Sequence, residues 1–113
     1  MARDTEQHAV VLSDEVWAAT QERAALERTT ASEICERLLG HYLGLDEKPA
    51  RRELPADIQT KQRSIHVRPM TWAAARAQKV LEGRPVSGIL EQLLRAYLGF
   101  SLSAETDEHE RPF

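Results

Sequence analysis

The sequence contains one internal repeat, and this repeat limits the possible folds more than any other feature. Shifted by 55 residues, residues 8–45 align with residues 63–100 without a gap, and 13 of the 38 aligned pairs are identical. The similarity is plainest between "ERLLGHYLGL" at 36–45 and "EQLLRAYLGF" at 91–100. A solenoid needs about three copies before its neighbours bury a continuous core. Two copies therefore indicate a small module that has been duplicated.

Each copy opens with alternating apolar and polar residues, which is typical of a half-buried β-strand. The runs are "QHAVVL" at 7–12 and "QRSIHV" at 62–67. The positions expected to face a core are Val10, Leu12, Ile65 and Val67. The positions expected to face outward are Gln7, Ala9, Val11, Gln62, Ser64 and His66.

A helix is predicted directly after each strand, over 14–27 and 69–82. Ser13 suits the N-cap position, and the acidic residues that follow it favour the first turn of a helix. In the second copy Pro69 suits the first helical position, and Arg68 stands where the capping serine would be. Both helices are rich in alanine, so they need support from tertiary contacts. Trp17 and Trp72 are interpreted as packing residues of these helices.

The second helix of each copy is strongly amphipathic. Thr30 and Glu33 have the spacing of a capping box, and Gly44 and Gly99 are predicted to end the helices as C′ residues. Cys35 lies on the apolar stripe and is expected in the core. The remaining predicted core or interface residues are Ile34, Leu38, Leu39, Tyr42, Ile89, Leu93, Leu94 and Tyr97.

One strand and two helices of this size cannot bury such stripes alone, whereas two copies can pair their strands and pack four helices against them. We therefore expect a mostly α fold with a short two-stranded antiparallel ribbon. The expected organisation is a first repeat over 1–45, a polar linker over 46–62, a second repeat over 63–100 and an acidic, disordered tail over 101–113. Both repeats are expected to form one domain.

The two copies differ in charge, although the whole chain carries only −3. Residues 8–45 contain three Arg against six Asp or Glu, whereas residues 63–100 contain six Lys or Arg against two Glu. Nucleic acids respond to a local basic surface rather than to the summed charge. The second copy is therefore the better candidate for contact with nucleic acid.

Several functional classes are disfavoured. No apolar run approaches the ~18 residues of a membrane span, and the polar start "MARDTEQ" does not resemble a signal peptide. The lone Cys35 excludes an internal disulfide and fits a reducing cytoplasm. The four His and this Cys lack metal-ligand spacing, and no nucleophile–base pair or glycine-rich phosphate loop is present. We expect a cytoplasmic protein without cofactor or metal that is not an enzyme.

The order of strand, capped helix, turn and "S-E-I-C-E-R-L-L-x-x-Y-L" resembles the ribbon-helix-helix family of Met and Arc repressors. The resemblance covers 8–45 and 63–100, and it implies a tandem version in which one chain supplies both halves of the usual dimer. In that family a two-stranded ribbon enters the major groove of double-stranded DNA. The base-reading positions would be Gln7, Ala9, Val11, Gln62, Ser64 and His66.

The resemblance also implies phosphate contacts at the N-termini of the second helices. These positions would be Thr30, Ala31 and Ser32 in the first copy and Val86, Ser87 and Gly88 in the second. Basic neighbours that would assist them are Lys61, Arg63, Arg68 and Arg84. An exposed strand residue without a special task is the alternative interpretation of His66, and a solvated turn residue is that of Arg84.

The expected function is therefore a sequence-specific transcriptional regulator, a repressor, associated with the nucleoid of a bacterium or archaeon. Its partner would be double-stranded DNA, bound mainly through the second repeat. None of the six outward ribbon positions is basic, which departs from the family pattern. The alternative is a protein-interaction module, antitoxin-like or an assembly adaptor, that binds a protein partner or itself and has weak or lost DNA binding.

Overall fold

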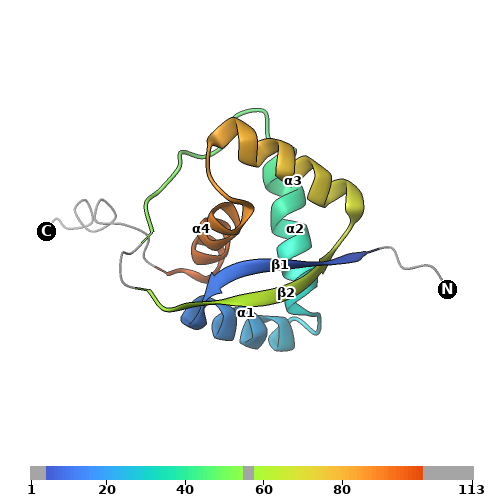
Figure 1. The fold of residues 1–113 in the computed structure, drawn as a ribbon. Coiled ribbons are helices and arrows are strands. Elements are labelled where there is room, and N and C mark those ends of the chain that lie inside the picture. The colour runs from blue at the N-terminus through green and yellow to red at the C-terminus, as the bar shows by residue number, and fades with distance from the viewer. Residues whose placement is uncertain (1–4, 55–57, 101–113) are drawn as a thin grey trace, which may run out of the picture.

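A computed structural model describes residues 5–54 and 58–100, so the predicted acidic tail over 101–113 lies outside the described residues. The chain folds as an α-rich unit with four helices and one two-stranded sheet in this range (Figure 1). The elements in chain order are β1 (Glu6–Ser13), α1 (Asp14–Leu26), α2 (Ala31–Leu43), β2 (Thr60–Val67), α3 (Pro69–Glu82) and α4 (Val86–Leu98).

The two strands form the antiparallel ribbon that the sequence predicts. Ala9 lies opposite Ser64, the residue that aligns with it in the repeat, so the pairing is centred on this pair. Val10, Leu12, Ile65 and Val67 are all buried on the inner face. Alternation along each strand therefore separates a core face from an outer face, as expected from the period of two.

The first helices begin where the sequence predicts. The Ser13 hydroxyl accepts a hydrogen bond from the Val16 N–H at 3.2 Å, which caps α1, and Pro69 is the first residue of α3. The start of α2 is capped in the same way, since the Thr30 hydroxyl accepts from the Glu33 N–H at 3.1 Å. The first turn of each of these helices is thus set by local sequence.

Both predicted glycines directly follow the last residue of their helix, but only Gly99 has the left-handed conformation typical of a C′ residue. Gly99 has φ +84° and ends α4 in the left-handed conformation, whereas Gly44 ends α2 at φ −85°, within the right-handed helical region. Left-handed residues also occur in the turns between helices, at Gly83 with φ +66° and at Arg28 with φ +59°. These two residues align in the repeat, so both copies use the same backbone turn.

A single core cluster draws on both halves of the chain. Of the eight predicted core residues, Leu38, Leu93 and Tyr97 are only partly buried and pack against the cluster. Burial raises the pKa of the Cys35 thiol to about 12. The buried members of the cluster are Val10, Leu12, Val16, Ala24, Ile34, Cys35, Leu39, Tyr42, Ile65, Val67, Ile89, Leu90 and Leu94.

The helices pack across the halves. The α2 helix packs on β2 and the α4 helix packs on β1, so each strand is covered by the second helix of the other copy. The ribbon runs across one side of this pair of helices, and α1 and α3 lie at opposite ends of the molecule (Figure 1). No helix within the described ranges is long and apolar enough to cross a membrane.

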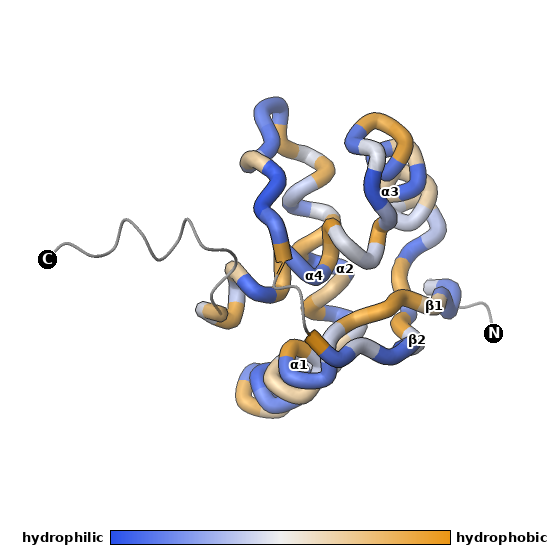
Figure 2. The backbone as a smooth tube through the Cα atoms, turned by 60° about the vertical axis from the view of Figure 1, so that its left-hand side comes forward, coloured by the Kyte–Doolittle hydropathy of each residue, from blue (hydrophilic) through white to orange (hydrophobic). Residues whose placement is uncertain are grey.

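The linker after α2 is hydrophilic and lies over α4 (Figure 2). The Gln92 side chain fixes it at two points, because its amide donates to the Ala50 carbonyl at 2.9 Å and its oxygen accepts from the Arg52 N–H at 3.0 Å. The described part of the linker is thus tied to the second half of the chain.

Candidate nucleic-acid interface

The outer face of the ribbon carries all six predicted base-reading positions. Gln7, Ala9, Val11, Gln62 and Ser64 are exposed, and His66 is half-buried. Within this face the Gln7 amide donates to the Ser64 hydroxyl at 3.0 Å. The face is therefore polar on the β2 side and more apolar on the β1 side, where Val11 is 47% exposed.

Two serines attach the second helices to the edges of the ribbon. The Ser32 hydroxyl, in the first turn of α2, accepts from the His66 backbone N–H at 2.9 Å. The Ser87 hydroxyl, in the first turn of α4, accepts from the Val11 backbone N–H at 2.8 Å. These contacts correspond to each other in the repeat. Each brings a helix N-terminus beside the outer face of the ribbon.

Two glutamates make a second pair of corresponding contacts, at the junction of strand and first helix. The Glu91 carboxylate accepts from the Ser13 N–H at 2.9 Å and from its hydroxyl at 2.7 Å. The Glu36 carboxylate accepts from the Arg68 N–H at 2.9 Å and from the Thr71 hydroxyl at 2.6 Å. Each glutamate therefore fixes the point at which the opposite strand leaves the ribbon.

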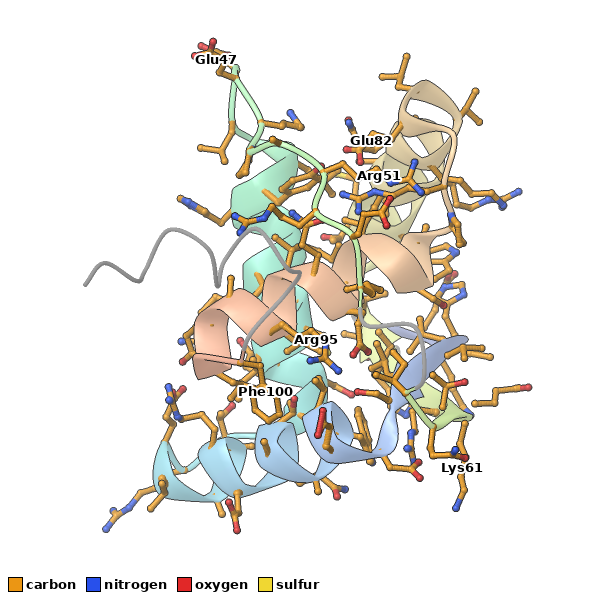
Figure 3. The ribbon with its side chains drawn as sticks, turned by 90° about the vertical axis from the view of Figure 1, so that its left-hand side faces the viewer. Glu47, Arg51, Lys61, Glu82, Arg95 and Phe100 are labelled. Atoms are coloured by element: carbon orange, nitrogen blue, oxygen red, sulfur yellow. The ribbon has the colours of Figure 1, made fainter. Side chains whose placement is uncertain are left out.

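Glu91 is buried together with a positive charge. Arg95 is 2% exposed and donates to the Glu91 carboxylate at 2.8 Å. It lies between α4 and α1 (Figure 3), where it also reaches the Glu15 carboxylate at 3.3 Å. A buried charge needs such partners to offset its loss of hydration.

Both tryptophans pack on the strand of the opposite half, as their interpretation as packing residues requires. The ring of Trp72 stacks on that of His8 with centroids 4.1 Å apart. The Arg63 guanidinium lies over the Trp17 ring at 5.7 Å from its centroid. His8 and Arg63 align in the repeat, so this is a third corresponding pair.

Two tyrosines make a fourth pair of corresponding contacts between the halves. The Tyr42 hydroxyl donates to the Glu82 carboxylate, and the Tyr97 hydroxyl donates to the Glu27 carboxylate. Burial and this hydrogen bond raise the pKa of Tyr42. Burial alone would raise the pKa of Glu82, but hydrogen bonds from Tyr42, Gln78 and Arg84 together lower it.

Arg84 is not a solvated turn residue. Its side chain is 5% exposed and turned into the molecule, where it donates to the Glu82 carboxylate and to the Gln92 side-chain oxygen, both at 2.8 Å. Desolvating a guanidinium is unfavourable without such partners, and they hold it away from the surface. These internal contacts do not present Arg84 to phosphate, and its phosphate contact stays a prediction.

Arg63 is also engaged. Its side chain is 14% exposed and pairs with the Asp14 carboxylate at 2.5 Å, on the inner side of the ribbon. Of the four predicted basic neighbours, Lys61 and Arg68 are exposed. Lys61 projects from the end of the ribbon away from the helices (Figure 3). A phosphate contact of the second half would thus depend on these two residues and on backbone groups.

The predicted phosphate positions lie at the two helix N-termini but differ in exposure. Thr30 is exposed, Ala31, Ser32, Ser87 and Gly88 are half-buried, and Val86 is buried. The α4 helix begins after Pro85 without a side-chain cap. Because the first N–H groups of a helix lack intrahelical acceptors, those of Val86 and Ser87 can bind an anion.

The residues that join the halves, chiefly Glu36 and Glu91, were not predicted from the sequence. A usable signal was present, because the two glutamates align in the repeat, are identical and lie beside the apolar stripe of their helices. No group of His, Cys, Asp and Glu side chains within residues 5–54 and 58–100 could hold a metal ion.

Comparison of the chain with models of known protein families, with curated proteins and with solved structures found no match.

Proposed function

We propose that this protein is a sequence-specific DNA-binding regulator built as a tandem ribbon-helix-helix unit, in which one chain supplies both halves. The observation that carries the proposal is the combination of an exposed ribbon face with two helix N-termini attached to its edges by Ser32 and Ser87. A two-stranded ribbon fits the major groove, and helix N-termini bind phosphate.

In the proposed complex the outer face of the ribbon reads base edges. Gln62, Ser64 and His66 supply hydrogen-bonding groups, and a glutamine can pair bidentately with adenine. Ala9 and Val11 supply apolar contact, which suits a thymine methyl group. Because the two strands differ in this way, the preferred DNA site is asymmetric, unlike the palindrome that an identical pair of subunits favours.

The helix N-termini hold the flanking phosphates. At α2 the Thr30 and Ser32 hydroxyls stand beside the first backbone N–H groups, and each hydroxyl that accepts a bond can still donate its own hydrogen. At α4 the uncapped start after Pro85 leaves N–H groups for the same task. Lys61 and Arg68 add positive charge at the second strand. Repression follows from occupancy of the groove, which blocks access of polymerase to the same DNA, in the cytoplasm of a bacterium or archaeon.

The proposal is tested by selecting bound fragments from random double-stranded DNA at low salt. The wild-type chain should enrich one asymmetric sequence. Ser64→Glu places a carboxylate at the centre of the ribbon and should abolish the enrichment, because the groove is lined by phosphate charge. Ala96→Glu makes the same kind of change on an exposed position of α4 and should leave the enrichment intact. Equal behaviour of the two variants would contradict the assigned face.

A protein-interaction module is the second candidate. It is favoured by the absence of Lys and Arg from all six outward ribbon positions and by the engagement of Arg63 and Arg84 in internal pairs. In this case no DNA sequence would be enriched at any salt concentration. The Ser64→Glu variant would then alter only the binding of a protein partner.

A further inference from the structure

The outer face of α3 carries an apolar surface with nothing packed on it among the described residues. Only Ala75 of this helix is buried. Met70, Val80 and Leu81 are 76%, 77% and 79% exposed. We call this surface the α3 stripe, and its members are Met70, Ala73, Ala74, Ala77, Val80 and Leu81. Contiguous exposed apolar surface of this kind marks a site of interaction.

The charge beside the α3 stripe is positive. Arg76 and Lys79 border a shallow hollow lined by Ala73, Ala77 and Val80. Neither cation has a hydrogen bond or an ion pair with any residue that the structure describes. Glu82, the acidic residue of this helix, points inward and bonds to Tyr42 and Arg84 (Figure 3). A partner that fits this surface is therefore apolar and acidic.

The corresponding face of α1 has the complementary character. It consists of Ala18, Gln21, Glu22, Ala25 and Leu26, all of them exposed, and we call it the α1 face. Leu26 is 82% exposed. Glu22 has no ion pair within the described ranges, whereas Asp14 and Glu15 at the start of the same helix are paired with Arg63 and Arg95. Small and apolar side chains beside acidic ones are what the α3 stripe requires.

We propose that copies of this chain associate head to tail, with the α3 stripe of one copy docked on the α1 face of the next. The two helices lie at opposite ends of the molecule, on either side of the ribbon (Figures 1 and 3), so a single copy can use both surfaces at once. Pairing of α3 with α3 would instead bring two sets of Arg76 and Lys79 together. A contact between unlike surfaces is heterologous and produces an open row unless its rotation closes a ring.

The association needs no DNA and stands apart from the proposed function. One helix face on each side makes a small interface, so self-association is weak and depends on concentration. A row of copies would present several ribbons, and binding of adjacent copies to one long DNA would then be cooperative.

The test uses the full chain without DNA in sedimentation velocity over a range of concentrations. Wild-type protein should form species larger than a pair as the concentration rises. Val80→Glu disables the α3 stripe and Ala25→Arg disables the α1 face, so each variant alone should stay monomeric. Because each keeps one working surface, a mixture of the two should form one-to-one pairs and nothing larger. Ala96→Glu, outside both surfaces, should behave as wild type.

A charge exchange gives a second readout that does not depend on loss of apolar contact. Arg76→Glu and Glu22→Arg should each weaken association by roughly 10-fold. The double variant should recover it, because charges of opposite sign again face each other between the α3 stripe and the α1 face. The proposal is overturned if wild-type protein is monomeric at every concentration. It is also overturned if the mixture of single variants forms no pairs. It is overturned as well if Ala25→Arg and Glu22→Arg do not change self-association, which would indicate contact between two α3 stripes.

Discussion

At the scale of single residues, the identical polar side chains of the repeat have one shared role. Ser32 and Ser87, Glu36 and Glu91, and the paired tyrosines all make hydrogen bonds to the opposite half of the chain. A contact that crosses between the halves constrains both copies at once. The outward ribbon residues make no such corresponding contacts, and only Gln7 and Gln62 are identical between the copies, whereas Ala9 aligns with Ser64 and Val11 with His66.

Arg28 and Gly83 share a left-handed conformation, but this conformation is less favourable in free energy for arginine than for glycine. A residue with a Cβ in this region is disfavoured by about 1 kcal/mol, whereas glycine is not. We expect Arg28→Gly to raise the free energy of unfolding by roughly 0.5–1 kcal/mol. We expect Gly83→Ala to lower it by about 1 kcal/mol, although an added Cβ would meet nothing within 4 Å.

Urea unfolding followed by circular dichroism measures both changes. Arg28→Ala is the control, because it removes the long side chain but keeps the Cβ. Stabilisation by Arg28→Ala equal to that by Arg28→Gly would show that the side chain, and not the backbone angle, is responsible.

At the scale of the elements, the strands and helices could be predicted from sequence because their signals are local. The alternation of apolar and polar residues predicted both faces of the ribbon. Ser13, Thr30 and Pro69 indicated helix starts that depend only on neighbouring residues. The conformation of Gly44 at the end of α2 could not be predicted, because glycine adopts positive and negative φ with similar ease and the following residues decide between them.

The candidate site was harder to predict than the elements. The outer ribbon positions follow from alternation, but the inward turn of Arg84 depends on Glu82 and Gln92, and the placement of Arg63 depends on Asp14. The second of these pairs joins residues far apart in the chain. A basic residue near a site in sequence can thus be held away from the site by a partner that only the fold supplies.

The two junction glutamates should contribute unequally to stability. Glu91 is buried with Arg95, and Glu91→Ala leaves that guanidinium without its nearest carboxylate, so we expect a loss of about 3 kcal/mol. Glu36 is half-buried and its partners are neutral groups, so we expect Glu36→Ala to cost about 1 kcal/mol. Chemical denaturation of both variants under the same conditions gives the comparison. Equal losses would contradict the role assigned to the buried pair of charges.

At the scale of the whole molecule, the interlocked packing implies that neither half unfolds before the other. Each strand is covered by a helix of the opposite copy, and the core cluster is shared. Trp17 and Trp72 report on the first helix of each half. In the single-tryptophan variants Trp72→Phe and Trp17→Phe, fluorescence and circular dichroism should give one coincident midpoint within each protein. A tryptophan midpoint clearly different from that of the helices would indicate halves that unfold independently.

The two halves have similar cores but different surfaces. The shared core preserves one architecture, whereas the ribbon strands and the outer faces of α1 and α3 differ in chemistry. Fusion of the halves allows this divergence, because a chain that carries both copies need not present the same surface twice. The proposed asymmetric DNA site and the proposed association between unlike ends both depend on that freedom.

The most direct test of the DNA-binding account is the affinity of the full chain for its selected DNA as a function of salt. Contacts of the helix N-termini, Lys61 and Arg68 with a few phosphates predict an affinity that falls by roughly 10- to 100-fold between about 50 and 200 mM salt. At each salt concentration the selected site should stay preferred over unrelated DNA. Absence of binding to any fragment at the lowest salt would contradict the account.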